Sequence, residues 1–144
     1  MRFMVLVKAS KDSEAGVMPS EELMTEMGKF NEEMGKAGIV LAAEGLHPTS
    51  KGVRLKFSGK NRTVVEGPFS ETNELVAGFW LIDVKSRKEA IEWMKRCPNP
   101  MNDDSEIEIR QVFEEEDFGD EFTPEARAME ARMREQIAAK NKQA

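Results

Sequence analysis

Several residue types that build common functional sites are scarce in this sequence. Its 144 residues include one cysteine, Cys97, one histidine, His47, and no tyrosine. A single cysteine excludes an internal disulfide and a metal site built from cysteines, and it fits a reduced, cytoplasmic chain. Because no spacing of carboxylates around the one histidine indicates a transition-metal site, we expect no metal and no cofactor.

Excess basic charge and long apolar runs are lacking as well. Lys plus Arg number 21 against 27 Asp plus Glu, for a net charge of −6, so we expect no nucleic-acid partner. No apolar run reaches the ~18 residues of a membrane-spanning helix. The apolar segment near the start is too short for a signal-peptide core. We therefore predict a cytoplasmic protein with no membrane association, with 40% hydrophobic residues to build a core.

Charge divides the chain near residue 115. Residues 114–121, EEEDFGDE, include six acidic and no basic side chains, which is typical of a solvated connector. The 23 residues after them carry five basic and three acidic side chains. We predict a compact domain over 1–115, followed by an acidic connector and C-terminal helix over 116–144.

Apolar periodicity predicts the order of the elements. Alternating residues indicate strands at 2–8, 39–46, 53–57, 62–66, 76–84 and 106–113, with a hairpin turn at SGKN. Helical spacing indicates helices beginning near Ser20, Ser86 and Thr123, the second with a Ser86–Glu89 capping box, and residues 9–18 read as a loop. The predicted stripe of the first helix is Leu23, Met27, Phe30, Met34 and Ala37. The order predicts a ferredoxin-like split βαβ, an α+β fold with a C-terminal helical extension.

The strands at 2–8 and 76–84 are apolar on both faces. Two helices cover one face of such a sheet, and burial of the other is worth ~25 cal/mol per Å². We predict a homodimer whose sheets face each other and enclose a cavity, with Trp80 packed in the dimer face. The alternative is a tail helix that folds back over the open face.

One segment resembles a known family. Residues 66–80, EGPFSETNELVAGFW, resemble the DGPF segment of the YCII-related proteins, whose usual form is close to DGPFAETKELIGGFW. Segments at 45–60, 85–98 and 106–113 also look like that family in order and spacing. The resemblance implies a dimeric α+β barrel, a fold shared with muconolactone isomerases and related dehalogenases, and no single activity. Some members look like companions of extracytoplasmic-function sigma factors, which implies a sigma factor as a further partner.

The motif differs from the family pattern at its first residue. Glu66 stands where aspartate is usual, so the carboxylate is kept but moved outward by about one methylene. Two interpretations of the motif remain open. Gly67 and Pro68 form a structural corner with Phe69 packed into the core, or the polar side chains of the segment rim the mouth of the cavity. Those polar residues are Glu66, Ser70, Glu71, Thr72 and Glu74.

His47 is a candidate for proton transfer, because histidine titrates near neutral pH. Glu44 precedes it by three residues and could orient the ring, and such a pair suits proton abstraction from a small acid or lactone. With Glu66, these are the candidate catalytic residues. The alternative is an ordinary surface-loop histidine.

Two arginines on strand patterns are candidates for an acidic ligand. Arg110 would bind a ligand carboxylate if its face lines the cavity, or else form a salt bridge with Glu108. The full set of candidate ligand-binding residues is Arg54, Arg110, Ser70, Glu71, Thr72 and Trp80.

Three functions remain open at this point. The first is a homodimer whose cavity binds or transforms a small acidic metabolite by isomerase- or lyase-type proton transfer. The second is a non-catalytic accessory protein linked to sigma-factor-dependent transcription. The third is a structural dimer whose cavity is only packing.

Overall fold

The structure is a computed structural model that describes residues 1–143. It divides into two compact units, Met1–Val112 and Phe113–Ala144, which we describe separately. The first unit contains β1 (Arg2–Lys8), α1 (Lys11–Glu14), α2 (Glu21–Lys36), β2 (Val40–Gly45), η1 (Thr49–Lys51), β3 (Val53–Ser58), β4 (Asn61–Glu66), β5 (Val76–Asp83), α3 (Arg87–Met94) and β6 (Ile107–Gln111). The second contains η2 (Glu115–Asp117) and α4 (Pro124–Gln143).

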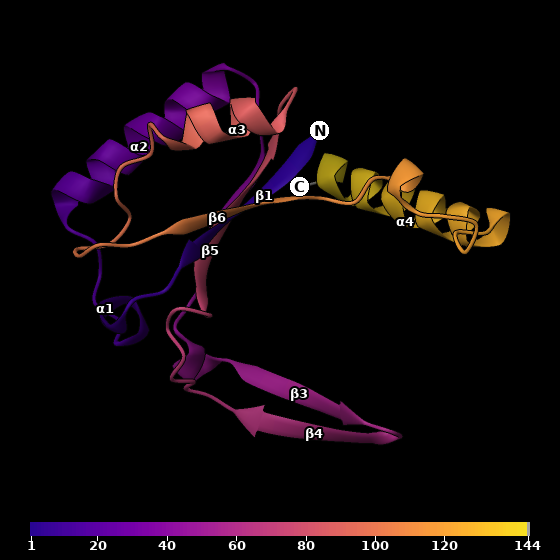
Figure 1. The fold of residues 1–144 in the computed structure, drawn as a ribbon, viewed down its shortest axis with the longest axis horizontal. Helices are drawn as coiled ribbons and strands as arrows, with labels where there is room; N and C mark the ends of the chain where they lie inside the picture. The colour runs from indigo at the N-terminus through magenta and orange to yellow at the C-terminus, as the bar shows by residue number, and fades with distance from the viewer. Residues whose placement is uncertain (144) are drawn as a thin grey trace. The chain divides into compact units, whose positions relative to one another are not determined.

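The first unit is built on a four-stranded sheet with the strand order β2-β5-β1-β6. All three pairings are antiparallel, and α2 and α3 lie on one face of the sheet (Figure 1). This order is that of the ferredoxin-like plan, with the β3–β4 hairpin inserted between β2 and β5. The predicted α+β fold with a C-terminal helix is confirmed.

The core lies between the sheet and these two helices. Its buried members are Phe3, Val5, Phe30, Met34, Ile39, Trp80, Ile82, Val84, Ala90 and Met94. Trp80 pairs with Val5 in the sheet and meets the Phe30 ring edge-on, with ring centroids 6.1 Å apart. The prediction that Trp80 packs in a dimer face is therefore wrong, because the alternation of β5 turns Trp80 toward the helices. In α2, Phe30 and Met34 are buried as predicted, whereas Ala37 is the C-cap that follows the helix and is exposed.

The opposite face of the sheet faces away from α2 and α3 and carries two cross-strand rows. One row runs Glu44, Phe79, Leu6 and Glu108, and the next runs Ala42, Leu81, Met4 and Arg110. The four large apolar side chains at the centre of these rows are half-buried rather than fully buried. The centre of this face is thus apolar, and three of its four edge positions are charged, the fourth being Ala42.

The β3–β4 hairpin extends from the sheet on the side away from α2 and α3 (Figure 1). Its strands pair with each other over six residue pairs and form a separate two-stranded sheet. Alternation places Val53, Leu55, Phe57 and Val64 on one side of this ribbon. All four are exposed, by 53–69%.

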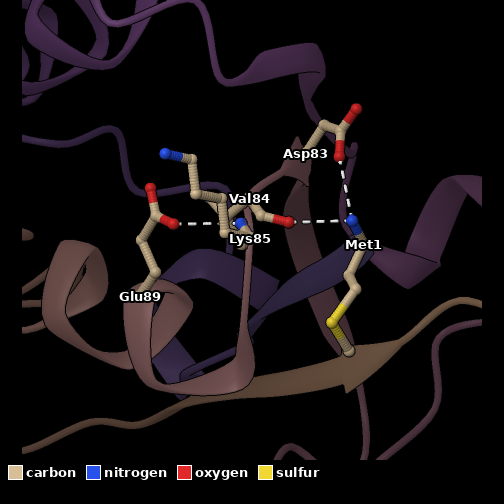
Figure 2. Close-up of polar contacts among 5 residues, drawn as sticks. All are labelled: Met1, Asp83, Val84, Lys85 and Glu89. Carbon is tan, nitrogen blue, oxygen red and sulfur yellow. Dashed lines mark hydrogen bonds and ion pairs between the residues drawn. The ribbon is translucent and has the colours of Figure 1, made fainter.

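Local hydrogen bonds set the helix starts. The Ser20 hydroxyl accepts from the Leu23 N–H, as expected of an N-cap. At α3 the Ser86 hydroxyl accepts from the Glu89 N–H at 3.1 Å. The Glu89 carboxylate accepts from the Lys85 N–H at 2.9 Å rather than from Ser86, and Figure 2 shows the bond to Lys85. The predicted capping box is thus shifted by one residue. In the same view, the Met1 amino group donates to Asp83 Oδ1 at 3.2 Å and to the carbonyl of Val84 at 2.8 Å.

The segment predicted as a loop over 9–18 contains the short helix α1. Reciprocal bonds between Ser10 and Ser13 hold its first turn, at 2.8 Å and 3.0 Å. Four residues are too few to show helical periodicity, which is why the sequence pattern did not reveal it.

In the second unit, the ring of Phe118 packs between those of Phe113 and Phe122, with centroids 5.1 Å and 5.3 Å apart. Thr123 then begins α4, its hydroxyl accepting from the Ala126 N–H at 3.1 Å. Within residues 1–143, no helix combines the length and apolarity that a membrane crossing requires.

Candidate functional site

A cavity of about 720 Å³ opens at one end of the four-stranded sheet. Its walls come from the segment 10–19 that includes α1, from the first half of α2, and from the chain that leaves β2. Residues 100–102 and the start of β5 complete it. The volume lies in the range of small-molecule sites, about 300–1,000 Å³.

Four methionines contribute to the apolar surface of the cavity. Met18, Met24, Met27 and Met101 all line it, together with Leu23. Met18 and Met24 are 73% and 56% exposed, so they form part of an open rim rather than a packed core. Flexible, polarisable thioethers adapt to ligands of different shape.

Trp80 contributes to the cavity from β5 and is fixed by Asn31 of α2. The indole Nε1–H donates to Asn31 Oδ1 at 2.8 Å. This bond satisfies the polar edge of an indole that is 6% exposed. The ring therefore offers a fixed apolar surface to the cavity.

The charged groups around the cavity are mostly carboxylates. Glu44 and Asp12 line it with His47, and among the described residues that line it none is Lys or Arg. Asp12 accepts from the side-chain amide of Asn102 at 3.3 Å. Such a lining favours a neutral or cationic polar group over an anionic one.

The structure places His47 and Glu44 at the same cavity without pairing them. Within residues 1–143, no hydrogen bond or ion pair joins the two side chains. Glu44 lies in the row of Phe79 on the face away from α2, whereas His47 follows the end of β2 and is exposed. The proton-transfer pair considered from the sequence is not assembled.

A hydrogen-bonded link fixes the α1 wall of the cavity. The Glu14 carboxylate accepts from the Thr49 N–H at 3.1 Å and from the Thr49 hydroxyl. The same hydroxyl accepts from the Phe69 N–H at 2.9 Å. Thr49 therefore connects α1 to the EGPF segment, residues 66–69.

The geometry at Gly67 and Phe69 supports the structural-corner interpretation of the EGPF segment. A Cβ atom on Gly67 would lie 1.8 Å from the carbonyl oxygen of Thr49, so no larger residue fits. The Gly67 N–H donates to the Gly52 carbonyl at 2.9 Å, and the Gly67–Pro68 peptide is cis. The Phe69 ring, predicted to enter the core, instead lies half-buried beneath the Arg54 guanidinium, 3.8 Å from its centroid.

The other polar residues of the motif do not line this cavity. Glu66 pairs with Val53 at the base of the hairpin and is exposed. The Ser70 hydroxyl donates to the neighbouring Glu71 carboxylate at 3.5 Å. Thr72 lines a different, polar hollow of about 490 Å³.

Arg110 lies on the sheet face away from α2 and α3, paired with Glu108. Its Nη1 donates to Glu108 Oε2 at 3.2 Å, and Lys8 Nζ lies 3.4 Å from the other carboxylate oxygen. The hydrogen bond from Arg110, together with the charge of Lys8, lowers the pKa of Glu108. Because β2 and β6 are the two edges of the sheet, Arg110 and Glu44 are separated by at least three strand spacings, about 14 Å. Arg110, Glu44 and Glu66 thus do not converge on one site.

Neither Cys97 nor a carboxylate cluster adds a second reactive site. Burial raises the pKa of the Cys97 thiol to about 11, so it is not a thiolate near neutral pH. Within the described residues, no group of three or more His, Cys, Asp or Glu side chains is arranged to hold a metal ion.

Sequence reasoning missed the methionine rim and Asn31. Met18 lies in a segment without periodicity, and Met24 lies on the side of α2 away from the predicted stripe. The excess of methionine, 10 in 144 residues, was the available signal. Of the predicted site residues, the cavity brings together His47, Glu44 and Trp80.

Comparison with known proteins identifies a family and a relative. The model of a family described as the YCII-related domain matches residues 1–116. A protein of Rhizobium meliloti (strain 1021), named Uncharacterized protein R00369, is 30% identical over 92 residues, which are 64% of this chain and 74% of that protein.

Proposed function

Since the chain belongs to the YCII-related family, we propose that it is a small-molecule-binding protein whose ligand occupies the methionine-rimmed cavity between α1, α2 and the end of β2. The observation that carries this proposal is the combination of a volume of about 720 Å³ with a largely preformed apolar lining around Trp80. Apolar surface with a few polar groups at the edge is the usual composition of a ligand pocket.

The lining indicates the chemistry of the ligand. An apolar or aromatic body would pack against Trp80 and the methionines, and a polar end would face Asp12 and His47. Because the acidic residue Asp12 and no Lys or Arg line this wall of the described cavity, this polar end is neutral or cationic. This differs from the acidic ligand considered from the sequence, whose candidate cations Arg54 and Arg110 are engaged with Phe69 and Glu108.

Three probes of one shape and different charge test the proposal. 2-Phenylethylamine, 2-phenylethanol and phenylacetate are titrated into the isotope-labelled full chain, and binding is followed by the NMR signal of the Trp80 indole N–H. We expect the ammonium probe to bind best and the carboxylate worst. A preference for phenylacetate would contradict the proposed ligand class, and unchanged Trp80 signals with all three would contradict the site.

Two glycines of α2 provide matched variants. Gly28 lines the cavity and Gly35 does not, and a Cβ atom at either position meets nothing within 4 Å. Gly28→Leu should fill part of the cavity and weaken binding of the best probe roughly ten-fold or more, as loss of about 1.4 kcal/mol implies. Gly35→Leu should leave binding unchanged. Equal affinities in the two variants would place the probe elsewhere.

The sheet face away from α2 and α3 supports a homodimer. Met4, Leu6, Phe79 and Leu81 form a continuous apolar centre there, and no helix of the unit Met1–Val112 covers them. A second copy offers the same surface, so a two-fold pairing would bury both. Sedimentation over a range of concentrations tests this: a dimer that Leu81→Asp dissociates supports it, and a monomer at micromolar concentration contradicts it.

A sigma factor remains the alternative partner that the family resemblance suggests. That accessory role predicts a stable complex on co-purification from native cells. Substitutions that fill the cavity should not affect this complex. Gly28→Leu therefore separates the two proposals, because it should affect the ligand and leave such a complex intact.

A further inference from the structure

The β3–β4 hairpin has an unusual apolar surface for an exposed ribbon. Val53, Leu55, Phe57 and Val64 share one side of it, and Phe57 is 69% exposed. An isolated two-stranded hairpin is only marginally stable in water, and it needs packing on one face for stability. Contiguous apolar side chains of this kind mark an interaction surface.

The base of the hairpin is anchored, so the ribbon is presented in a defined direction. The Gly67 N–H donates to the Gly52 carbonyl where the two strands leave the rest of the unit. The Arg54 guanidinium packs on the Phe69 ring at the same place. Beyond this anchor, the ribbon extends on the side of the sheet away from α2 and α3 (Figure 1).

Charge distinguishes between the possible occupants of this surface. Residues 51–66 carry five basic side chains and one carboxylate, whereas the whole chain has a net charge of −6. The rest of the chain is therefore strongly acidic. Two hairpins packed on each other would bring like charges together, while a hairpin on the body of a second copy brings opposite charges together.

We propose that the β3–β4 hairpin is an arm that packs its apolar side on the body of a second copy of this chain. The inference rests on the proposed homodimer. It adds the hairpin as a second part of the dimer interface, beside the facing sheets. The apolar side chains supply the buried contact, and Arg62, which lies on the same side of the ribbon, meets the acidic remainder of the partner. Arg62 belongs to this contact, because its guanidinium lies 4.6 Å from the Phe57 ring centroid.

Photo-crosslinking of the full chain tests the arm directly. A benzophenone amino acid replaces Phe57 in one sample and Thr63 in another, since Thr63 pairs with Lys56 and so lies on the opposite side of the ribbon. Heavy- and light-isotope copies are mixed before irradiation, so that peptides joined between two copies are recognised by their mixed labels. We expect mixed-label products from position 57, joined to residues outside 51–66, and few from position 63.

Sedimentation of substituted chains provides the second measurement. Leu55→Ser with Phe57→Ser should raise the dissociation constant of the dimer by roughly ten-fold or more, because each loses most of a buried apolar side chain. Lys56→Ser with Thr63→Ser, on the opposite side of the ribbon, should change it far less. High salt should weaken the wild-type dimer.

The outcomes separate the arm from the homodimer itself. A dimer that persists with only same-copy or no crosslinks at position 57 overturns the arm and leaves the facing-sheet dimer standing. A monomer throughout overturns both. Mixed-label crosslinks confined to 51–66 would indicate hairpin-on-hairpin pairing and overturn the proposed occupant. Binding of a short DNA duplex that is lost with Phe57→Ser, while the dimer is unaffected, would assign the basic hairpin to DNA. That result would also overturn the proposed occupant.

Discussion

Thr49 and Glu14 are 35 positions apart and are joined by hydrogen bonds from the Thr49 N–H and from its hydroxyl to the Glu14 carboxylate. Because the same hydroxyl accepts from the Phe69 N–H, one side chain connects the wall of the cavity with the EGPF segment. The EGPF segment is thereby tied to the wall of the cavity without lining the cavity itself.

Thr49→Val should loosen the α1 wall. The change keeps the shape of the side chain but removes both side-chain hydrogen bonds, at a cost of about 1–3 kcal/mol in the free energy of unfolding. Amide hydrogen exchange in 10–18 should speed up more than exchange in β1. Thr49→Ser keeps the hydroxyl and is the control, so equal protection in both variants would refute the link.

Gly67→Ala should be strongly destabilising. The added Cβ would lie 1.8 Å from the Thr49 carbonyl oxygen, which is backbone and cannot rotate away. We expect a loss of about 3–5 kcal/mol on urea unfolding. Gly35→Ala, in α2 with open space around it, should instead stabilise by about 0.5–1 kcal/mol. Similar effects of the two changes would contradict the corner geometry.

The carboxyl group of Glu108 should titrate below its ordinary range, since the Arg110 hydrogen bond and the charge of Lys8 lower its pKa. Arg110→Ala and Lys8→Ala should each move this pKa upward. For a lowered folded pKa, the stabilisation is present above the pKa of the unfolded state and is lost as pH falls through the folded value. NMR titration of the Glu108 carboxyl carbon measures the pKa in both variants. An unchanged pKa in Arg110→Ala would exclude the hydrogen bond between Arg110 and Glu108.

The Cys97 thiol should react slowly with thiol reagents at neutral pH, because burial raises its pKa to about 11. Its contribution to stability is fully present below the pKa of the unfolded thiol, ~8.5, and is lost as pH rises from there to about 11. The difference in unfolding free energy between wild type and Cys97→Ser should therefore change over this interval. A flat difference, or fast modification in the native state, would show an accessible thiolate.

Much of the fold was predictable because strand alternation and caps are local signals. The alternation at Arg2–Lys8 and Val76–Asp83 and the capping serine at Ser20 gave the correct elements. The short helix α1 was missed because reciprocal serine bonds, not periodicity, hold it. Trp80 was placed on the wrong face because both faces of β5 are apolar, and only the position of the helices distinguishes them.

The site was predicted less well, since the candidate residues lie on separate strands and loops whose arrangement in space local patterns do not give. Glu66 and Arg54 belong to the hairpin and its anchor, and Arg110 lies on the far edge strand, so these residues do not share the cavity of His47. Conversely, Met18 and Asn31 line one cavity because the segment that follows α1 and the helix α2 both border it with the chain that leaves β2. Such long-range convergence leaves no mark in local sequence patterns.

The most direct test of the small-molecule site is an NMR experiment that detects contacts between 2-phenylethylamine and the labelled methyl groups of methionine. The cavity predicts contacts to Met18, Met24, Met27 and Met101, which line it from three separate segments, and their loss in Gly28→Leu. Contacts confined to other methionines, such as Met129 and Met133 of α4, or contacts that persist in Gly28→Leu, would contradict the account.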